Sequence, residues 1–95
     1  MNAGSAVTSD TAQAQQGMIT VLFDNEQKSV RPALLTLKNE FQDIIHTSFQ
    51  ARMSGDLDLE IVLVRGDAAR IRSIEEQLVS KRGVRSVRLT LIPRE

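Results

Sequence analysis

Residues 57–92, LDLEIVLVRGDAARIRSIEEQLVSKRGVRSVRLTLI, contain the pattern that decides the fold. An alternating strand runs into Gly66-Asp67, and aspartate is a residue type that commonly caps the start of a helix. The helix that follows ends before Gly83, because glycine readily adopts the left-handed conformation found after helices. A second alternating strand then runs as far as Pro93. The segment therefore predicts a strand, a helix and a second strand.

The residues before this segment repeat the same order of elements. The apolar run Met18–Phe23 predicts a buried strand. The helix that follows has Pro32 in its first turn and Ser29 as a candidate N-cap. Its apolar stripe consists of residues spaced by three or four: Val30, Leu34, Leu37 and Phe41. Residues 45–53 alternate as a strand, and Ser54-Gly55-Asp56 supplies a hairpin turn to the next strand.

The order βαββαβ predicts an α+β, ferredoxin-like (ACT-like) fold, with a four-stranded antiparallel sheet and two helices on one face. We expect the helices to cover the side of the sheet that bears Phe49, Ile61 and Leu89. The open face would then carry the alternate set: His46, Gln50, Arg52, Asp58, Glu60, Val62 and Val64. Because a small domain has little core of its own, we expect Val62 and Val64 to contact a second subunit.

Composition restricts the function classes. The chain has 95 residues, of which 41% are hydrophobic and 25% charged, and this balance is typical of one globular domain. Residues 1–16 have almost no large apolar side chains and are predicted to be a disordered tail before a domain at 17–95. A net charge of zero argues against direct nucleic-acid binding. With no cysteine, no secretory signal and no apolar span, we expect a cytoplasmic protein that does not contact membranes.

Candidate reactive residues are few. His46 is the only histidine, and a single imidazole without cysteine makes a poor metal site. Ser48 shares its face but has no recognisable oxyanion turn, so we expect no enzyme activity. The alternating acids Asp56, Asp58 and Glu60 could attract a hard cation, although a solvated edge is the more common role for such a pattern.

The GD and RGV turns, in register with the hairpin, resemble the C-terminal regulatory domain of the nickel-responsive ribbon-helix-helix repressors (NikR), over residues 17–93. The resemblance implies a square-planar site built from an H-x-H on the second strand, a Cys on the third, and a His from a neighbouring subunit's first helix. The H-x-H positions correspond to Gln50 and Arg52, the Cys to Asp58, and the neighbour's His to Asn39. None of these is a good nickel ligand, so we expect no metal or other cofactor here.

The prediction is therefore a non-enzymatic regulatory and oligomerisation module that lacks the family's DNA-binding half and nickel ligands. We expect a homo-oligomer, dimer or tetramer, with a partner protein as a further candidate. The alternative is a sensor that binds an amino acid or a weakly held metal at a subunit interface.

Arg52 and Asp58 lie on adjacent strands and on one face of the predicted hairpin. We expect them at the interface, in a charge-assisted network centred on Arg52 that includes Gln50 and Asn39 and replaces the metal. A solvent-exposed ion pair with little energetic effect is the alternative.

Overall fold

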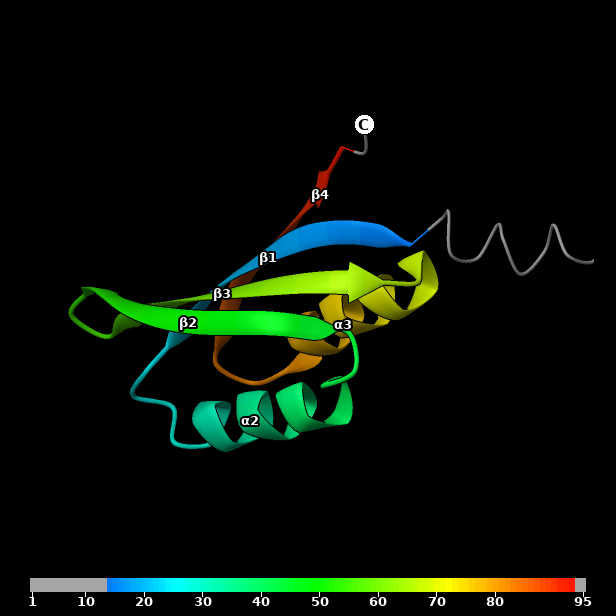
Figure 1. Ribbon diagram of the computed structural model, residues 1–95. Coiled ribbons are helices and arrows are strands. Elements are labelled where there is room, and N and C mark those ends of the chain that lie inside the picture. The colour runs from blue at the N-terminus through cyan, green and yellow to red at the C-terminus, as the bar shows by residue number, and fades with distance from the viewer. Residues whose placement is uncertain (1–13, 94–95) are drawn as a thin grey trace, which may run out of the picture.

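The computed structural model describes residues 14–93 and contains the elements in the predicted order. They are β1 (Gln15–Asp24), α2 (Val30–Glu40), β2 (Ile45–Ser54), β3 (Leu57–Gly66), α3 (Ala68–Ser80) and β4 (Val84–Ile92). Both helices lie on the same side of the sheet (Figure 1). Residues 1–13 of the predicted tail lie outside the described residues. β1 begins at Gln15, two residues before the expected start of the domain at residue 17.

The sheet has the strand order β2-β3-β1-β4, and every neighbouring pair is antiparallel. This is the ferredoxin-like arrangement that the order of elements predicts. β3 is an inner strand, paired with β1 on one side and with β2 on the other. Its register with β2 places Gln50 opposite Glu60 and Arg52 opposite Asp58.

The local signals act where the sequence places them. The Asp67 carboxylate accepts a hydrogen bond from the Ala69 N–H at 3.1 Å, which caps α3. Gly83 has a φ of 92°, and a Cβ there would lie 3.0 Å from the Cβ of Gln27. Glycine is therefore required both by the backbone conformation and by the space. Ser29 is the N-cap of α2 as expected, although its side chain makes no capping hydrogen bond.

The core lies between the helices and one face of the sheet. The helices bury Val30, Leu34 and Leu37 from α2 and Ile71, Ile74 and Leu78 from α3. The sheet contributes five further buried apolar side chains: Ile19, Val21, Phe23, Val62 and Val64. The buried residues of α2 match the apolar stripe predicted for that helix.

The predicted assignment of the two sheet faces is wrong for β2 and β3. Val62 and Val64 are each only 3% exposed and pack in the subunit's own core, so they do not lie on an open face. Phe49, expected beneath the helices, is 53% exposed. Only Leu89 packs against the core as expected. Both alternate sets on β3 contain apolar residues, so alternation alone could not decide which set faces inward.

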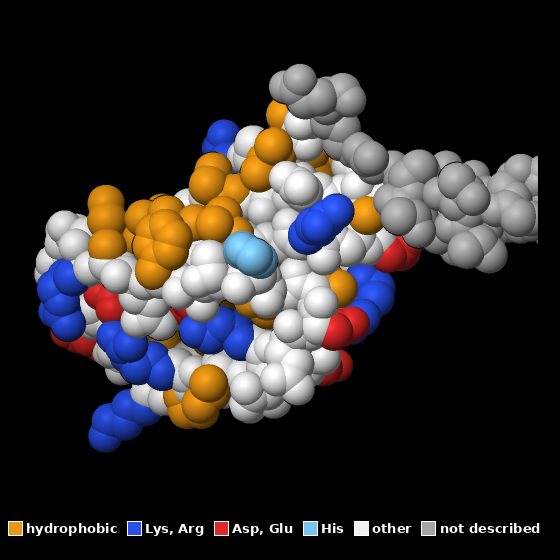
Figure 2. All heavy atoms as spheres, viewed as in Figure 1, with side chains coloured by type: hydrophobic (Ala, Val, Ile, Leu, Met, Phe, Trp, Pro, Cys, Tyr) orange, Lys and Arg blue, Asp and Glu red, His pale blue; other side chains and the backbone are white. Residues whose placement is uncertain are grey.

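The open face of the sheet is consequently apolar over much of its area. By alternation from the buried residues of β1 and β3, it carries nine hydrophobic side chains: Met18, Leu22, Phe49, Ala51, Met53, Leu57, Leu59, Ile61 and Leu63. We call this set the open apolar face. Hydrophobic side chains gather along the upper side of the molecule, away from α2 and α3 (Figure 2). Within residues 14–93, no helix is long and apolar enough to cross a membrane.

Candidate functional site

Two carboxylates on β3 point toward the helices and are almost completely buried. Asp58 is 4% exposed and Glu60 is 1% exposed. In the β1–β3 register they lie opposite Phe23 and Val21, two fully buried apolar residues. A buried carboxylate is very costly unless it is paired and hydrogen-bonded, so the partners of these two groups explain how the domain tolerates them.

Asp58 receives donors on both of its oxygens. Arg31 Nη2 from α2 lies 2.7 Å from Oδ2, and Asn25 Nδ2 from the loop after β1 lies 2.8 Å from Oδ1. Arg52 is more distant, with Nε 4.0 Å from Oδ1, and its side chain is 67% exposed. The guanidinium of Arg31 also lies 5.7 Å from the centre of the Phe23 ring, within range of a cation–π interaction.

Glu60 is held in the same way. Lys38 Nζ from α2 lies 2.7 Å from Oε2, and Gln50 Nε2 from β2 donates to Oε1 at 2.7 Å. Gln50 also accepts a hydrogen bond from Arg31 Nη1 at 3.0 Å. Its amide therefore links Glu60 to Arg31, which pairs with Asp58. We call this group the α2–β3 ion cluster: Asn25, Arg31, Lys38, Gln50, Asp58 and Glu60.

Helix periodicity explains how one element supplies both cations. Arg31 and Lys38 are seven residues apart, which is close to two helical turns, so both project from the same side of α2. Their targets are two residues apart on β3 and therefore project from the same face of the sheet. Lys and Arg side chains gather in the region between β2 and α2 (Figure 2). The cluster thus joins α2 to the sheet through charged contacts beside the apolar core.

The predicted site residues are only partly brought together. Gln50 and Asp58 are in the α2–β3 ion cluster, and Arg52 lies at its rim opposite Asp58, as the register required. The network is not centred on Arg52, because Arg31 forms the shorter ion pair with Asp58. Asn39 is exposed in this subunit, and its contact with the site of a neighbouring subunit stays a prediction.

The sequence did not predict three members of the cluster, and it predicted the wrong sheet face for its two acids. Asn25, Arg31 and Lys38 were not considered, and Glu60 was expected on a solvated face together with Asp58. The available signal was the spacing of Arg31 and Lys38, which puts two cations on one side of a helix that must cover a strand containing alternate acids.

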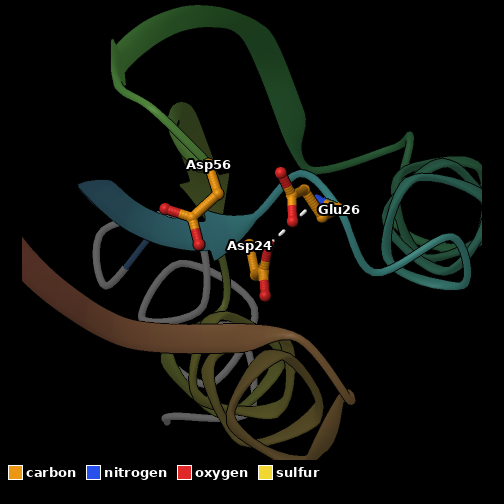
Figure 3. A group of neighbouring side chains, drawn as sticks. All are labelled: Asp24, Glu26 and Asp56. Carbon is orange, nitrogen blue, oxygen red and sulfur yellow. Dashed lines mark hydrogen bonds between the residues drawn. The ribbon is translucent and has the colours of Figure 1, made fainter.

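A second acidic group lies at the turn of the β2–β3 hairpin, where Asp56 precedes Asp58 by two residues. Asp24 at the end of β1, Glu26 in the following loop and Asp56 in the β2–β3 turn place carboxylate oxygens within 4.8 Å of one another (Figure 3). The Glu26 N–H donates to Asp24 Oδ1 at 2.9 Å. Arg85 Nη2 lies 3.3 Å from Asp24 and 3.6 Å from Asp56, so a cation of the chain already contacts two of the three acids.

His46 and Ser48 do not form a nucleophile and base pair. The Ser48 hydroxyl instead accepts from Lys38 Nζ at 3.5 Å. His46 lines a shallow hollow of about 260 Å³ near the ends of β1, β3 and β4, together with Gln16, Arg65 and Ile92.

The geometry defines an α+β, ferredoxin-like domain with one helix-covered face, one open apolar face and a closed ion cluster. Comparison with known proteins identifies the family. Residues 16–92 match the family model of the NikR C-terminal nickel-binding domain, and the chain belongs to this family.

The curated relatives are longer proteins. A protein of Methanococcus vannielii named "Putative nickel-responsive regulator" is 32% identical over 79 residues, covering 83% of this chain and 56% of that protein. A "Putative nickel-responsive regulator 3" of Methanosarcina mazei is 29% identical, covering 86% of this chain and 59% of that protein. The chain thus spans rather more than half the length of these relatives.

Solved structures support the fold alone. An uncharacterized protein of Thermotoga maritima superposes with a TM-score of 0.73 at 16% identity, covering 84% of this chain and 99% of that one. The C-terminal domain of the MgtC protein of Mycobacterium tuberculosis gives a TM-score of 0.63 at 14% identity, covering 83% and 88%. At such identities the likeness carries no functional information.

The family name implies nickel, and the residues of the α2–β3 ion cluster do not fit it. Nickel in a tetragonal plane favours imidazole and thiolate donors, but the whole chain has one histidine and no cysteine. The four oxygens of Asp58 and Glu60 each already accept from a group of the chain. A metal would therefore have to displace donors that the fold holds in place.

Proposed function

We propose that the chain is a non-enzymatic regulatory module that assembles with a second copy of itself through the open apolar face. The observation that carries this proposal is the composition of that face. Phe49 and Met53 are both more than half exposed, and they belong to a continuous apolar area on the sheet. Monomeric proteins rarely leave such an area uncovered, so it indicates a contact surface.

The strand register supports a contact centred on two rows of apolar residues. Phe49 lies opposite Ile61, and Ala51 lies opposite Leu59, which in turn lies opposite Leu22 on β1. These rows carry no charge across β2, β3 and β1. Arg88 lies at the β4 end of the row that contains Phe49, so the charge-free part is displaced toward the β2 edge.

A second copy is the occupant that the chemistry favours. A face with few charges is complementary to itself, and two such sheets can pack face to face about 10 Å apart in an isologous dimer. The net charge of zero adds no long-range repulsion between copies. The same absence of a basic excess supports regulation through protein contacts rather than through direct contact with nucleic acid.

The names of the relatives and the composition of the chain support the proposed regulatory role and location. Two relatives are named as putative nickel-responsive regulators, and these names support a regulatory role. We therefore assign regulation rather than catalysis to this domain. A chain without cysteine is compatible with a reducing compartment, and we propose the cytoplasm.

Sedimentation velocity at tens of micromolar tests the assembly. We expect the wild-type chain to sediment as a dimer or a larger species. Phe49→Lys should shift it to the monomer, because the new charge would be buried against the partner copy. The matched control is Val79→Lys, which changes a similarly exposed apolar residue on α3, 63% exposed, and should leave the assembly unchanged. A monomeric wild type, or equal effects of the two variants, would contradict the proposal.

A further inference from the structure

The charges of the α2–β3 ion cluster are balanced within one subunit. Asp58 and Glu60 contribute two negative charges, and Arg31 and Lys38 contribute two positive charges in direct contact with them. Arg52 adds a third cation at the rim. A divalent ion would introduce two further positive charges, so it could enter only by displacing these side chains.

The carboxylate oxygens of the cluster all accept hydrogen bonds as well. Asn25 and Gln50 supply neutral donors to the carboxylate oxygens that the cations do not contact. Within the described residues, no buried side-chain nitrogen or oxygen lacks a hydrogen-bond partner. A closed cluster of this kind offers an incoming metal neither a free ligand atom nor an unmatched charge.

The cluster also joins the elements that a metal could otherwise join. Lys38 and Arg31 come from α2, Gln50 from β2, and the two acids from β3. Three hydrogen bonds of 2.7 Å join the acids of β3 to α2 and β2. A fourth, of 3.0 Å, joins Arg31 of α2 to Gln50 of β2. The position of α2 over the sheet is therefore fixed by groups that are always present.

We infer that Arg31 and Lys38 are permanent internal counter-ions, and that this chain is a metal-independent member of a nickel-binding family. Its fold then does not respond to nickel, because the cations that stabilise the buried acids cannot leave with a change in metal supply. The inference concerns one subunit, so it can fail or hold independently of assembly through the open apolar face.

The same geometry predicts what removal of a cation would uncover. Without Lys38 two oxygen atoms lose the ammonium group that they contact: Oε2 of Glu60 and the hydroxyl oxygen of Ser48. Oxygen donors of this kind suit hard divalent cations such as Mn²⁺ or Ca²⁺ rather than Ni²⁺. Lys38→Met, which keeps an unbranched apolar stem, should therefore gain weak Mn²⁺ binding that the wild-type chain lacks.

The test is titration calorimetry of the full chain with NiCl₂ and with MnCl₂, together with urea unfolding in the presence of chelator or metal. For the wild type we expect no stoichiometric heat of binding and the same urea midpoint in all conditions. Lys38→Met should lower the midpoint by about 1 M, since it leaves Glu60 buried without its cation. Added MnCl₂ should restore part of that loss.

Two further variants make the result decisive. Lys28→Met removes an exposed lysine from the loop before α2 and should leave the midpoint unchanged. Lys38→Met/Glu60→Gln removes both charges and should be more stable than Lys38→Met. If Lys38→Met does not fold, Glu60→Gln alone is compared with the wild type. Stoichiometric Ni²⁺ binding by the wild type would overturn the inference. Equal midpoints for Lys38→Met and Lys28→Met would also overturn it.

Discussion

In the first half of β3 the two faces of the sheet reverse the usual relation between polarity and burial. The face beneath the helices contains two buried carboxylates, whereas the opposite face exposes Phe49, Met53 and much of a leucine-rich strand. The charged side is buried because α2 carries cations in register with the acids. The apolar side is exposed because the two helices cover only one face. Burial in this domain is thus decided by available partners and not by hydrophobicity alone.

The first and largest effect is a difference in stability between lysine substitutions at two neighbouring residues of β3. Val62→Lys places a charge in the core, where no acid is free to pair with it, and should reduce the free energy of unfolding by about 3–5 kcal/mol. Ile61→Lys changes the next residue on the open apolar face and should remain folded while losing assembly. Urea unfolding followed by circular dichroism measures the first effect, and sedimentation the second. Similar losses of stability in both variants would show that the faces are less distinct than the structure indicates.

The second effect distinguishes a buried carboxylate of β3 from an exposed carboxylate in the adjacent β2–β3 turn. Asp58→Ala removes the acceptor of Arg31 and Asn25 and should cost about 1–3 kcal/mol. Asp56→Ala removes an exposed carboxylate that only approaches Arg85, and it should cost less than about 0.5 kcal/mol. Urea midpoints of the two variants give the comparison. An Asp56 variant as unstable as the Asp58 variant would mean that the turn acids are structurally essential.

The elements could be predicted from sequence because each has a local signal. The capping carboxylate of Asp67, the glycine at 83 and the apolar stripe of α2 act within a few residues of chain, and all three are confirmed. The choice of sheet face could not be predicted in this way. On β3 the residues Asp58 and Glu60 make their alternate set look solvent-facing, and only contacts with a helix distant in sequence overturn that reading.

The candidate site could likewise be predicted only where it depends on local strand pairing. The pairing of Arg52 with Asp58 follows from hairpin register, and the structure confirms that they lie opposite each other. The stronger partner, Arg31, lies 27 residues away from Asp58, and its role depends on how α2 crosses the sheet. Residue alternation contains no information on that crossing. The roles of Val62 and Val64 at an interface failed for the same reason as the face assignment.

A third and smaller effect concerns the two glycines with positive φ. Gly83→Ala should cost about 1–2 kcal/mol, because its φ of 92° disfavours a side chain and the new Cβ would press on Gln27 and Val30. Gly55→Ala in the β2–β3 turn has a φ of 45° and open space around it, so its cost should be lower. Thermal unfolding of the two variants measures the difference. Equal melting temperatures would mean that the contacts around residue 83 can relax.

The smallest effect is a dependence on pH at an exposed ion pair away from both sheet faces. A hydrogen bond from the Arg70 guanidinium lowers the pKa of the Asp43 carboxyl below its ordinary value of 3.8. Because the folded pKa is depressed, the pair stabilises the fold above that ordinary value and loses this contribution as pH falls through the folded pKa. Asp43→Asn should therefore be slightly less stable than the wild type at neutral pH. The difference should disappear in acid. Urea midpoints measured from pH 7 down to below pH 3.8 follow it, with Glu76→Gln as the exposed control. A difference that persists unchanged in acid would show that Asp43 acts through packing rather than through its charge.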